Sequence, residues 1–367
     1  MMDSPDGLVW LTQQEYGWYI AAYLFFSGLA GGAYLTGFAA DLFGWRSGDE
    51  ATEQSMRAIT QWGVILALGA VAAGMFFLLF FHLGAPLRAM LFPVLFVNFG
   101  SWLVIGTWII VLFSIVAVLQ ALWLLWDPHR LTATGRVRGG LTGTSAFPRR
   151  ITAWIETRGG VPIDTWLTRL AAWTNPGRTG RLALSGVGSA LALGMVAYTG
   201  LKLGYVSATT PLWDGTLLPF LFLASALSIG LAATIGVTAL FEGIHGTKVT
   251  TFSIADDVII LGEVVVLVLL LATLASGGPG AIAAFELLTT EYGLLFWGGV
   301  VTIGLALPLA LSVLLIAVER RADVHTSERL GQLVRGAYTM KFSFVVLGGV
   351  ALRYLVIAAA YNAPLTT

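Results

Sequence analysis

The chain has 367 residues, of which 57% are hydrophobic and only 11% are charged, and its formal net charge is zero. A soluble domain carries about 25% charged residues, so lipid is the expected solvent for most of this surface. The zero net charge argues against nucleic acid as a partner. The absence of cysteine excludes disulfides, thiolate zinc sites and iron–sulfur clusters ligated by this chain.

Eight apolar segments are long enough to cross a bilayer, which takes about 20 mostly apolar residues. They lie at 17–42, 56–82, 98–126, 182–204, 216–242, 256–276, 292–317 and 337–361. We therefore predict an all-α membrane protein with eight transmembrane helices, arranged as two four-helix bundles. Residues 1–126 hold helices 1–3, residues 127–181 form a long basic loop, and residues 182–367 hold helices 4–8.

The loops between these segments are strongly asymmetric in charge. If the loops alternate between two sides, one side has Arg88 as its only basic loop residue. The other side has sixteen: Arg46, Arg57, Arg130, Arg136, Arg138, Arg149, Arg150, Arg158, Arg169, Arg178, Arg181, Lys248, Arg320, Arg321, Arg329 and Arg335. Because basic loops stay in the cytoplasm, this asymmetry predicts that both termini lie outside.

The long basic loop, residues 127–181, has an amphipathic pattern from Ile151 to Trp173. Such a pattern favours a helix that lies on anionic headgroups at the cytoplasmic surface. Docking of a cytoplasmic partner is the alternative.

One internal similarity links two predicted helices. Residues 24–35, LFFSGLAGGAYL, resemble residues 221–232, LFLASALSIGLA, and both segments begin on the outer side. A duplication with four helices in each half would produce this similarity. Two helices rich in small residues would also share it by chance, because such residues allow close packing in membranes.

Charged residues inside the spans are costly in hydrocarbon and often functional. Asp41, Glu242, Lys202 and Lys341 fall at predicted span ends, where interfacial placement is the ordinary expectation. Glu263 and Arg353 fall well inside segments 6 and 8, as a structural ion pair or as functional groups. We predict a proton path that runs from the cytoplasm through Asp41, Glu242, Glu263 and Arg353.

The four histidines do not fit a membrane haem. A b-type haem takes two axial histidines that face each other from neighbouring spans. His129, His245 and His325 lie in or beside the basic loops, and His82 lies at an outer helix end. No pair is placed to ligate a haem.

Six short motifs, in order, resemble the NrfD/PsrC family of membrane subunits. Segment 1 carries YLFFSGLAGGAY at 23–34, and HLGAPLR at 82–88 and NFGSW at 98–102 follow segment 2. YTGL begins at Tyr198, PLWD and LPFLFLAS follow at 211–225, and LGGVALRY occupies 347–354. The motifs extend over nearly the whole sequence except the long basic loop.

The resemblance implies a membrane-anchor and quinone-binding subunit of a multi-subunit respiratory oxidoreductase in the cytoplasmic membrane of a prokaryote. Such a subunit binds menaquinone or ubiquinone near the outer face and holds no haem or iron–sulfur cluster. It exchanges electrons with a four-cluster ferredoxin-like iron–sulfur subunit, which in turn serves a catalytic, molybdopterin subunit. The subunit itself is either non-catalytic or reactive only toward quinone.

A quinone needs an apolar slot, hydrogen-bond donors for its carbonyls and titratable groups nearby. On the resemblance, the expected quinone residues are Tyr23, His82, Arg88, Asn98 and Tyr198. Each also has an ordinary role open to it, as an interfacial aromatic, a helix cap or a headgroup contact. Some family members carry a polar residue near Ile20, where this chain is apolar.

Two other classes compete with this interpretation. A secondary transporter would show broken spans around polar groups at one depth, and Pro308 interrupts segment 7. A purely structural anchor for peripheral subunits is the second alternative.

Overall fold

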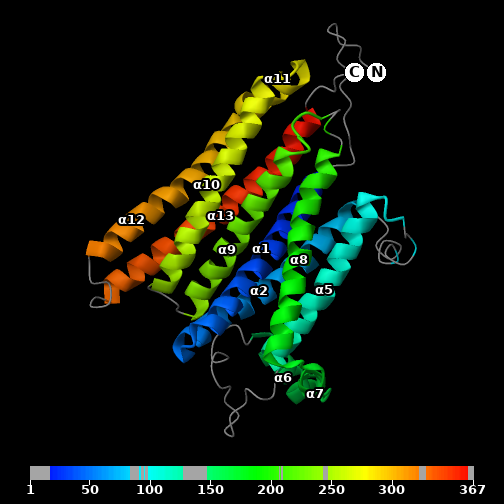
Figure 1. Cartoon of the computed structure of the whole chain (residues 1–367), viewed down its shortest axis with the longest axis vertical. Coiled ribbons are helices and arrows are strands. Elements are labelled where there is room, and N and C mark those ends of the chain that lie inside the picture. The colour runs from blue at the N-terminus through cyan, green and yellow to red at the C-terminus, as the bar shows by residue number, and fades with distance from the viewer. Residues whose placement is uncertain are drawn as a thin grey trace.

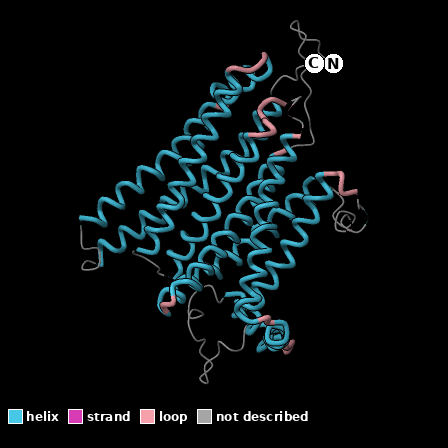
Figure 2. The backbone as a smooth tube through the Cα atoms, viewed as in Figure 1, coloured by secondary structure: helices cyan, strands magenta, loops and turns pink. Residues whose placement is uncertain are grey.

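The protein is a bundle of long helices that run side by side. The computed structural model describes residues 17–82, 91, 95, 98–126, 147–205, 207, 210–242, 247–321 and 328–362. Every regular element in these ranges is helical (Figures 1 and 2). Eight of the described helices are long and apolar enough to cross a membrane, as the sequence predicted.

The spans are formed by elements whose bounds extend beyond most of the predicted segments. They are α1 (Trp18–Ser47), α2 (Glu50–Phe77) with η1 (Leu78–His82), α5 (Trp102–Trp126), α8 (Gly177–Gly204), α9 (Leu217–Glu242), α10 (Thr247–Ala275), η5 (Leu294–Ala306) with α12 (Leu307–Arg321), and α13 (Glu328–Asn362). Shorter helices are α6 (Phe147–Gly159), α7 (Ile163–Thr174), α11 (Pro279–Glu286) and η4 (Leu287–Glu291).

Helices α1 and α9 lie at the centre of the bundle. Both pack against each other and against α2, α8 and α13. At their crossing the backbones touch, because a Cβ atom on Gly32 or on Gly230 would overlap the backbone of the other helix. This contact contains the two similar segments, 24–35 and 221–232. Their shared small residues therefore have a packing role, and duplication stays a prediction.

Two helices begin much earlier than the hydropathy of the sequence indicates. Helix α10 begins at Thr247 rather than at 256, and α13 begins at Glu328 rather than at 337. The added turns of α10 carry Thr, Ser and Asp residues, which lower hydropathy. They are helical because buried polar side chains on neighbouring helices bind them, as described below.

The seventh span is continuous, so the predicted interruption at Pro308 is wrong. The π-helix η5 leads directly into α12, and Pro308 lies in the first turn of α12. A proline lacks the N–H of the helical ladder and its ring crowds the carbonyl four residues earlier. The wider π-helical turns before it avoid this clash. In η5 the Thr302 hydroxyl donates to the Trp297 carbonyl, five residues back, at 2.7 Å.

The amphipathic part of the long basic loop forms two helices rather than one. Helix α6 ends at Gly159, and Gly160 adopts a left-handed φ of 67°. The Gly160 N–H donates to the Glu156 carbonyl at 3.2 Å, and α7 begins after Pro162. This turn is a glycine-terminated helix end, and it folds α7 back against α6.

Candidate functional site

Tyr23 and Tyr198, far apart in sequence, line one cavity near the N-terminal end of α1. Tyr23 comes from α1 and Tyr198 from α8, and both are buried. The other lining residues are Ile20, Leu24, Leu78, Thr199, Lys202 and Leu203. The free volume is about 10 Å³, which is about the space that one water needs. The cavity is apolar except for two phenol groups, one hydroxyl and one amine.

Local packing explains how the two tyrosines are held. The Tyr198 ring lies on Gly106 of α5, where a Cβ atom would overlap the ring. Lys202 follows Tyr198 by one helical turn and therefore lies on the same face of α8. The Tyr23 hydroxyl makes no hydrogen bond to any residue that the structure describes. It is thus placed to donate to a ligand.

The structure does not bring the other predicted quinone residues into this cavity. Asn98 is exposed, and its side-chain oxygen accepts a hydrogen bond from the Gly100 N–H at 3.0 Å. Its backbone carbonyl accepts from the Ser101 N–H, so Asn98 forms a turn that precedes α5. His82 is the last residue of η1, but its side chain and the whole of Arg88 lie outside the described residues.

A second polar site lies inside the bundle, between α10 and α13. Lys341 of α13 is fully buried, and its Nζ atom lies 2.7 Å from Asp257 Oδ1 and 3.5 Å from Asp256 Oδ2. The same nitrogen donates to the hydroxyl of Ser253 at 2.6 Å and to the Ser253 carbonyl at 3.1 Å. Ser312 of α12 donates to Asp257 as well. The interfacial placement predicted for Lys341 is therefore wrong.

Asp256 and Asp257 are functional candidates that the sequence reasoning missed. Asp256 is fully buried and accepts a hydrogen bond from Ser228 of α9 at 2.7 Å, while its Oδ2 atom has no hydrogen-bond partner among the described residues. A signal for them was present in the sequence. Asp256 and Glu263 are separated by seven residues, or about two turns, which places them on one face of α10.

Glu263 and Arg353 extend this polar line toward the middle of the bundle. Glu263 is buried on α10 and interacts with Ser225 of α9, with Asp256 and with the charge of Arg353. Arg353 of α13 is buried and donates to the Phe222 carbonyl at 3.1 Å. Its guanidinium also lies 4.5 Å from the centre of the Phe222 ring.

The guanidinium of Arg353 keeps spare hydrogen-bond donors. Within the part of the molecule that the structure describes, its Nε and Nη1 atoms have no hydrogen-bond partner, and no direct ion pair joins it to Glu263. Gly28 of α1 makes room for it, since a Cβ atom there would lie 3.3 Å from Arg353 Nη2. The two groups predicted to act together are thus electrostatic partners, with unfilled donors between them.

Asp41 and Glu242 lie elsewhere. Glu242, the last residue of α9, accepts a hydrogen bond from the indole N–H of Trp62 on α2 at 3.1 Å. Asp41 is half-buried near the end of α1. These contacts place Glu242 beside α2, whereas Glu263 interacts with α9 and α13.

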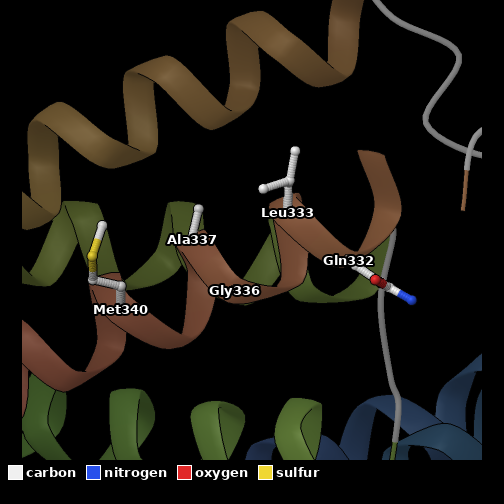
Figure 3. Close-up of a pocket in the computed structure, with 5 residues that line it drawn as sticks. All are labelled: Gln332, Leu333, Gly336, Ala337 and Met340. Carbon is white, nitrogen blue, oxygen red and sulfur yellow. The ribbon is translucent and has the colours of Figure 1, made fainter. Parts of the chain in front are cut away.

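A separate open groove runs along the first turns of α13. It has a volume of about 610 Å³ and is lined by Gln332, Leu333, Gly336, Ala337 and Met340. Figure 3 shows Leu333, Ala337 and Met340 pointing to the same side of the helix. Gln332 is the single polar side chain among them, so this groove lacks the donors of the tyrosine cavity.

Comparison with known proteins identifies the class of this eight-span bundle. Residues 11–364 match the family model described as "Polysulphide reductase, NrfD". The protein is also 28% identical to the C subunit of the polysulfide reductase of Wolinella succinogenes over 361 residues, which are 96% of this chain and 97% of that subunit. The chain belongs to the NrfD family, as its motifs indicated, and is a multi-pass membrane protein of that family.

Proposed function

We propose that this protein is the membrane-anchor and quinone-binding subunit of a multi-subunit respiratory oxidoreductase. Its relative is one subunit of polysulfide reductase, which supports a role within an oxidoreductase complex. The proposed partners are a four-cluster ferredoxin-like iron–sulfur subunit and a catalytic molybdopterin subunit on the outer face. The carrier is menaquinone or ubiquinone, and the partner's chemistry sets the direction of electron flow.

The observation that carries this proposal is the pair of buried phenols in one cavity. Two quinone carbonyls need two donors, and Tyr23 and Tyr198 supply them from different helices. Lys202 and Thr199 add an amine and a hydroxyl beside them. Ile20 contributes only apolar surface, so the hydrogen bonds of this site come from α8 and from Tyr23.

The cavity is closed in this structure, and a quinone ring enters when lining side chains move. Lys202 and Leu78 are half-buried, while Ile20, Leu24 and Leu203 are packed in the core. Leu78 belongs to the π-helical turn η1, whose wider spacing interrupts the helical ladder of α2. Entry therefore takes place between η1 and α8, on the side of these two residues.

The quinone site is tested by replacing each phenol with phenylalanine in the assembled complex. The loss of one hydrogen bond to the ring raises the KM for quinone about three- to tenfold. Activity with a soluble electron donor or acceptor at the catalytic subunit stays unchanged, and so does subunit assembly. Tyr205→Phe is the matched control, because Tyr205 follows α8 directly and is largely exposed outside the cavity.

Unchanged quinone kinetics in both Tyr23→Phe and Tyr198→Phe would refute the site. Retention of the partner subunits in those variants, with no quinone effect anywhere in the cavity, would favour a purely structural anchor. A lone active protein that purifies without an iron–sulfur protein would favour a transporter.

We also propose that the polar line along α10 and α13 carries protons. Three carboxylates, Asp256, Asp257 and Glu263, face two basic groups, Lys341 and Arg353. A buried set with an unbalanced charge is costly, so the line is neutral when it holds one extra proton. Ser228, Ser253, Ser312 and Ser225 provide hydroxyls between the charged groups. In this proposal Asp41 and Glu242 serve the cytoplasmic entrance.

Proton movement is tested in proteoliposomes that contain the whole complex and a pH-sensitive dye. Glu263→Gln is expected to abolish the quinone-linked pH change while quinone turnover continues with an uncoupler. Glu286→Gln is the control, because Glu286 ends the short helix α11 outside the polar line. Normal proton translocation in Glu263→Gln would remove Glu263 from the path without affecting the quinone proposal.

A further inference from the structure

The helices α6 and α7 carry an exposed apolar stripe that the proposed redox function leaves unused. On α6 the stripe consists of Phe147, Ile151 and Trp154, and on α7 it consists of Trp166, Leu170 and Trp173. Both follow the spacing i, i+4, i+7, which places the three residues on one helical face. Trp154, Trp166 and Trp173 are 60%, 62% and 84% exposed.

The opposite side of this hairpin is fixed to the bundle by polar contacts. The indole N–H of Trp126, at the end of α5, donates to Asp164 Oδ1 at 2.9 Å, and the Trp123 indole donates to Thr174 at 2.9 Å. Asp164 also accepts from Thr152 at 2.8 Å, which joins α6 to α7. These bonds determine which faces of α6 and α7 remain exposed.

The acidic residues of the hairpin are used internally, while basic residues remain exposed. Asp164 is bonded as described, and Glu156 accepts two hydrogen bonds from Thr165, at 2.6 and 2.9 Å. Arg158 continues the α6 stripe one turn beyond Trp154, and Arg169 lies between Trp166 and Leu170. Both are exposed and form no ion pair with any described residue.

The hairpin lies at the end of the bundle where the basic loops gather. It connects the last residue of α5 with the start of α8, and Arg178 of α8 forms an ion pair of 3.1 Å with Glu53 of α2. Figure 1 shows α6 and α7 beside the ends of the long helices. At such a position tryptophan rings reach the headgroup layer, and arginines extend toward phosphates.

We propose that the α6–α7 hairpin is an interfacial foot that rests its two Trp-containing stripes on anionic phospholipid headgroups. The stripes immerse beside the spans, and Arg158 and Arg169 bind the phosphates. The foot fixes the depth of α5 and α8 in the bilayer. It does not depend on the quinone proposal.

Because the natural protein has no cysteine, single cysteines report on each face without background. Ile151→Cys and Leu170→Cys place a nitroxide label on the stripes and leave every tryptophan in place. The matched controls are Ala153→Cys and Ala172→Cys, which are exposed on the same helices but off the stripes. The full-length protein is reconstituted in nanodiscs of phosphatidylcholine alone or mixed with phosphatidylglycerol.

In the mixed nanodiscs, the stripe labels are expected to be relaxed by oxygen and shielded from a water-soluble nickel reagent. The control labels are expected to remain accessible to nickel. The variant Arg158→Gln/Arg169→Gln should bind phosphatidylglycerol about fivefold more weakly for each charge removed, as measured by native mass spectrometry. Arg178→Gln, at the paired arginine, should not.

Stripe labels as open to nickel as the controls in both nanodiscs would overturn the proposal. Immersion of equal depth without phosphatidylglycerol, together with unchanged lipid affinity in the double variant, would overturn the role of anionic headgroups. Shielding that develops only when the partner subunits are added would assign the stripes to a protein interface instead.

Discussion

The side-chain nitrogen of Lys341 lies 2.7 Å from Oδ1 of Asp257, so an ion pair inside the bundle joins α13 to α10. The Lys341 side chain is fully removed from solvent, and Asp256 beside it is fully buried as well. Removing one member of such a pair leaves an uncompensated charge, which is the costly event for a buried ion pair.

Lys341→Met is therefore expected to destabilise the protein by about 3–5 kcal/mol. The measurement is thermal unfolding of the purified protein in detergent, followed by tryptophan fluorescence. The double variant Lys341→Met/Asp257→Asn should lose less than the sum of the two single variants, because they share one interaction. Additive losses would show that the two side chains are not coupled.

The crossing of α1 and α9 predicts a sharp difference between glycines. Gly230→Ala forces a methyl group into the backbone of α1 and is expected to cost at least about 1–3 kcal/mol, the usual range for overpacking. Gly262→Ala on α10 meets no atom within 4 Å and should be neutral or slightly stabilising. Thermal unfolding of both variants is the comparison. Equal stability of the two would contradict the close crossing.

Gly106 supports the ring of Tyr198, so its substitution acts on the tyrosine cavity from outside. Gly106→Ala is expected to displace the ring and raise the KM for quinone at least as much as Tyr198→Phe does. Gly194→Ala is the control at the same pair of helices, since its nearest neighbour is Ile109 at 3.6 Å, an ordinary contact. An unaffected KM in Gly106→Ala would separate Tyr198 from quinone binding.

Acid is expected to loosen the α6–α7 hairpin. The hydrogen bonds from the side chain and backbone of Thr165 lower the pKa of Glu156 from its ordinary value of 4.5. A carboxylate with a lowered folded-state pKa stabilises the fold above the ordinary pKa. That contribution disappears as the pH falls through the lowered value.

The measurement is the mobility of a nitroxide at Ala172→Cys as the pH is lowered below the ordinary range of glutamate. Mobility should rise in the parent protein, whereas Glu156→Gln should be more mobile at neutral pH and lack this transition. The same transition in both would assign it to another group.

The sequence predicted the number of spans because apolar length alone decides whether a helix crosses a bilayer. It also predicted that Tyr23 and Tyr198 share an outer site, since alternating topology places them at similar depth. It could not predict that Asn98 forms a local turn before α5, because a cap and a ligand-binding amide have the same sequence signature. Nor could it reveal that the cavity is closed, which depends on side-chain packing.

The start of α10 shows why the buried charges were misplaced. Hydropathy treats Ser253, Asp256 and Asp257 as loop-like, because it counts each polar group as if it were unpaired. In the fold these groups bind Lys341, Ser228 and Ser312 on three other helices. A pairing between distant positions has no trace in a local average, so Lys341 was assigned to the interface.

The backbone contact between Gly32 and Gly230 also limits how this molecule can move. Neither helix can turn about its own axis without driving a side chain into the other's backbone, so α1 and α9 behave as one rigid axle. Tyr23 and Gly28, which borders Arg353, lie on this axle only five residues apart. Signals between the tyrosine cavity and the buried arginine must therefore travel through displacement of the flanking helices α8 and α13 around a fixed centre.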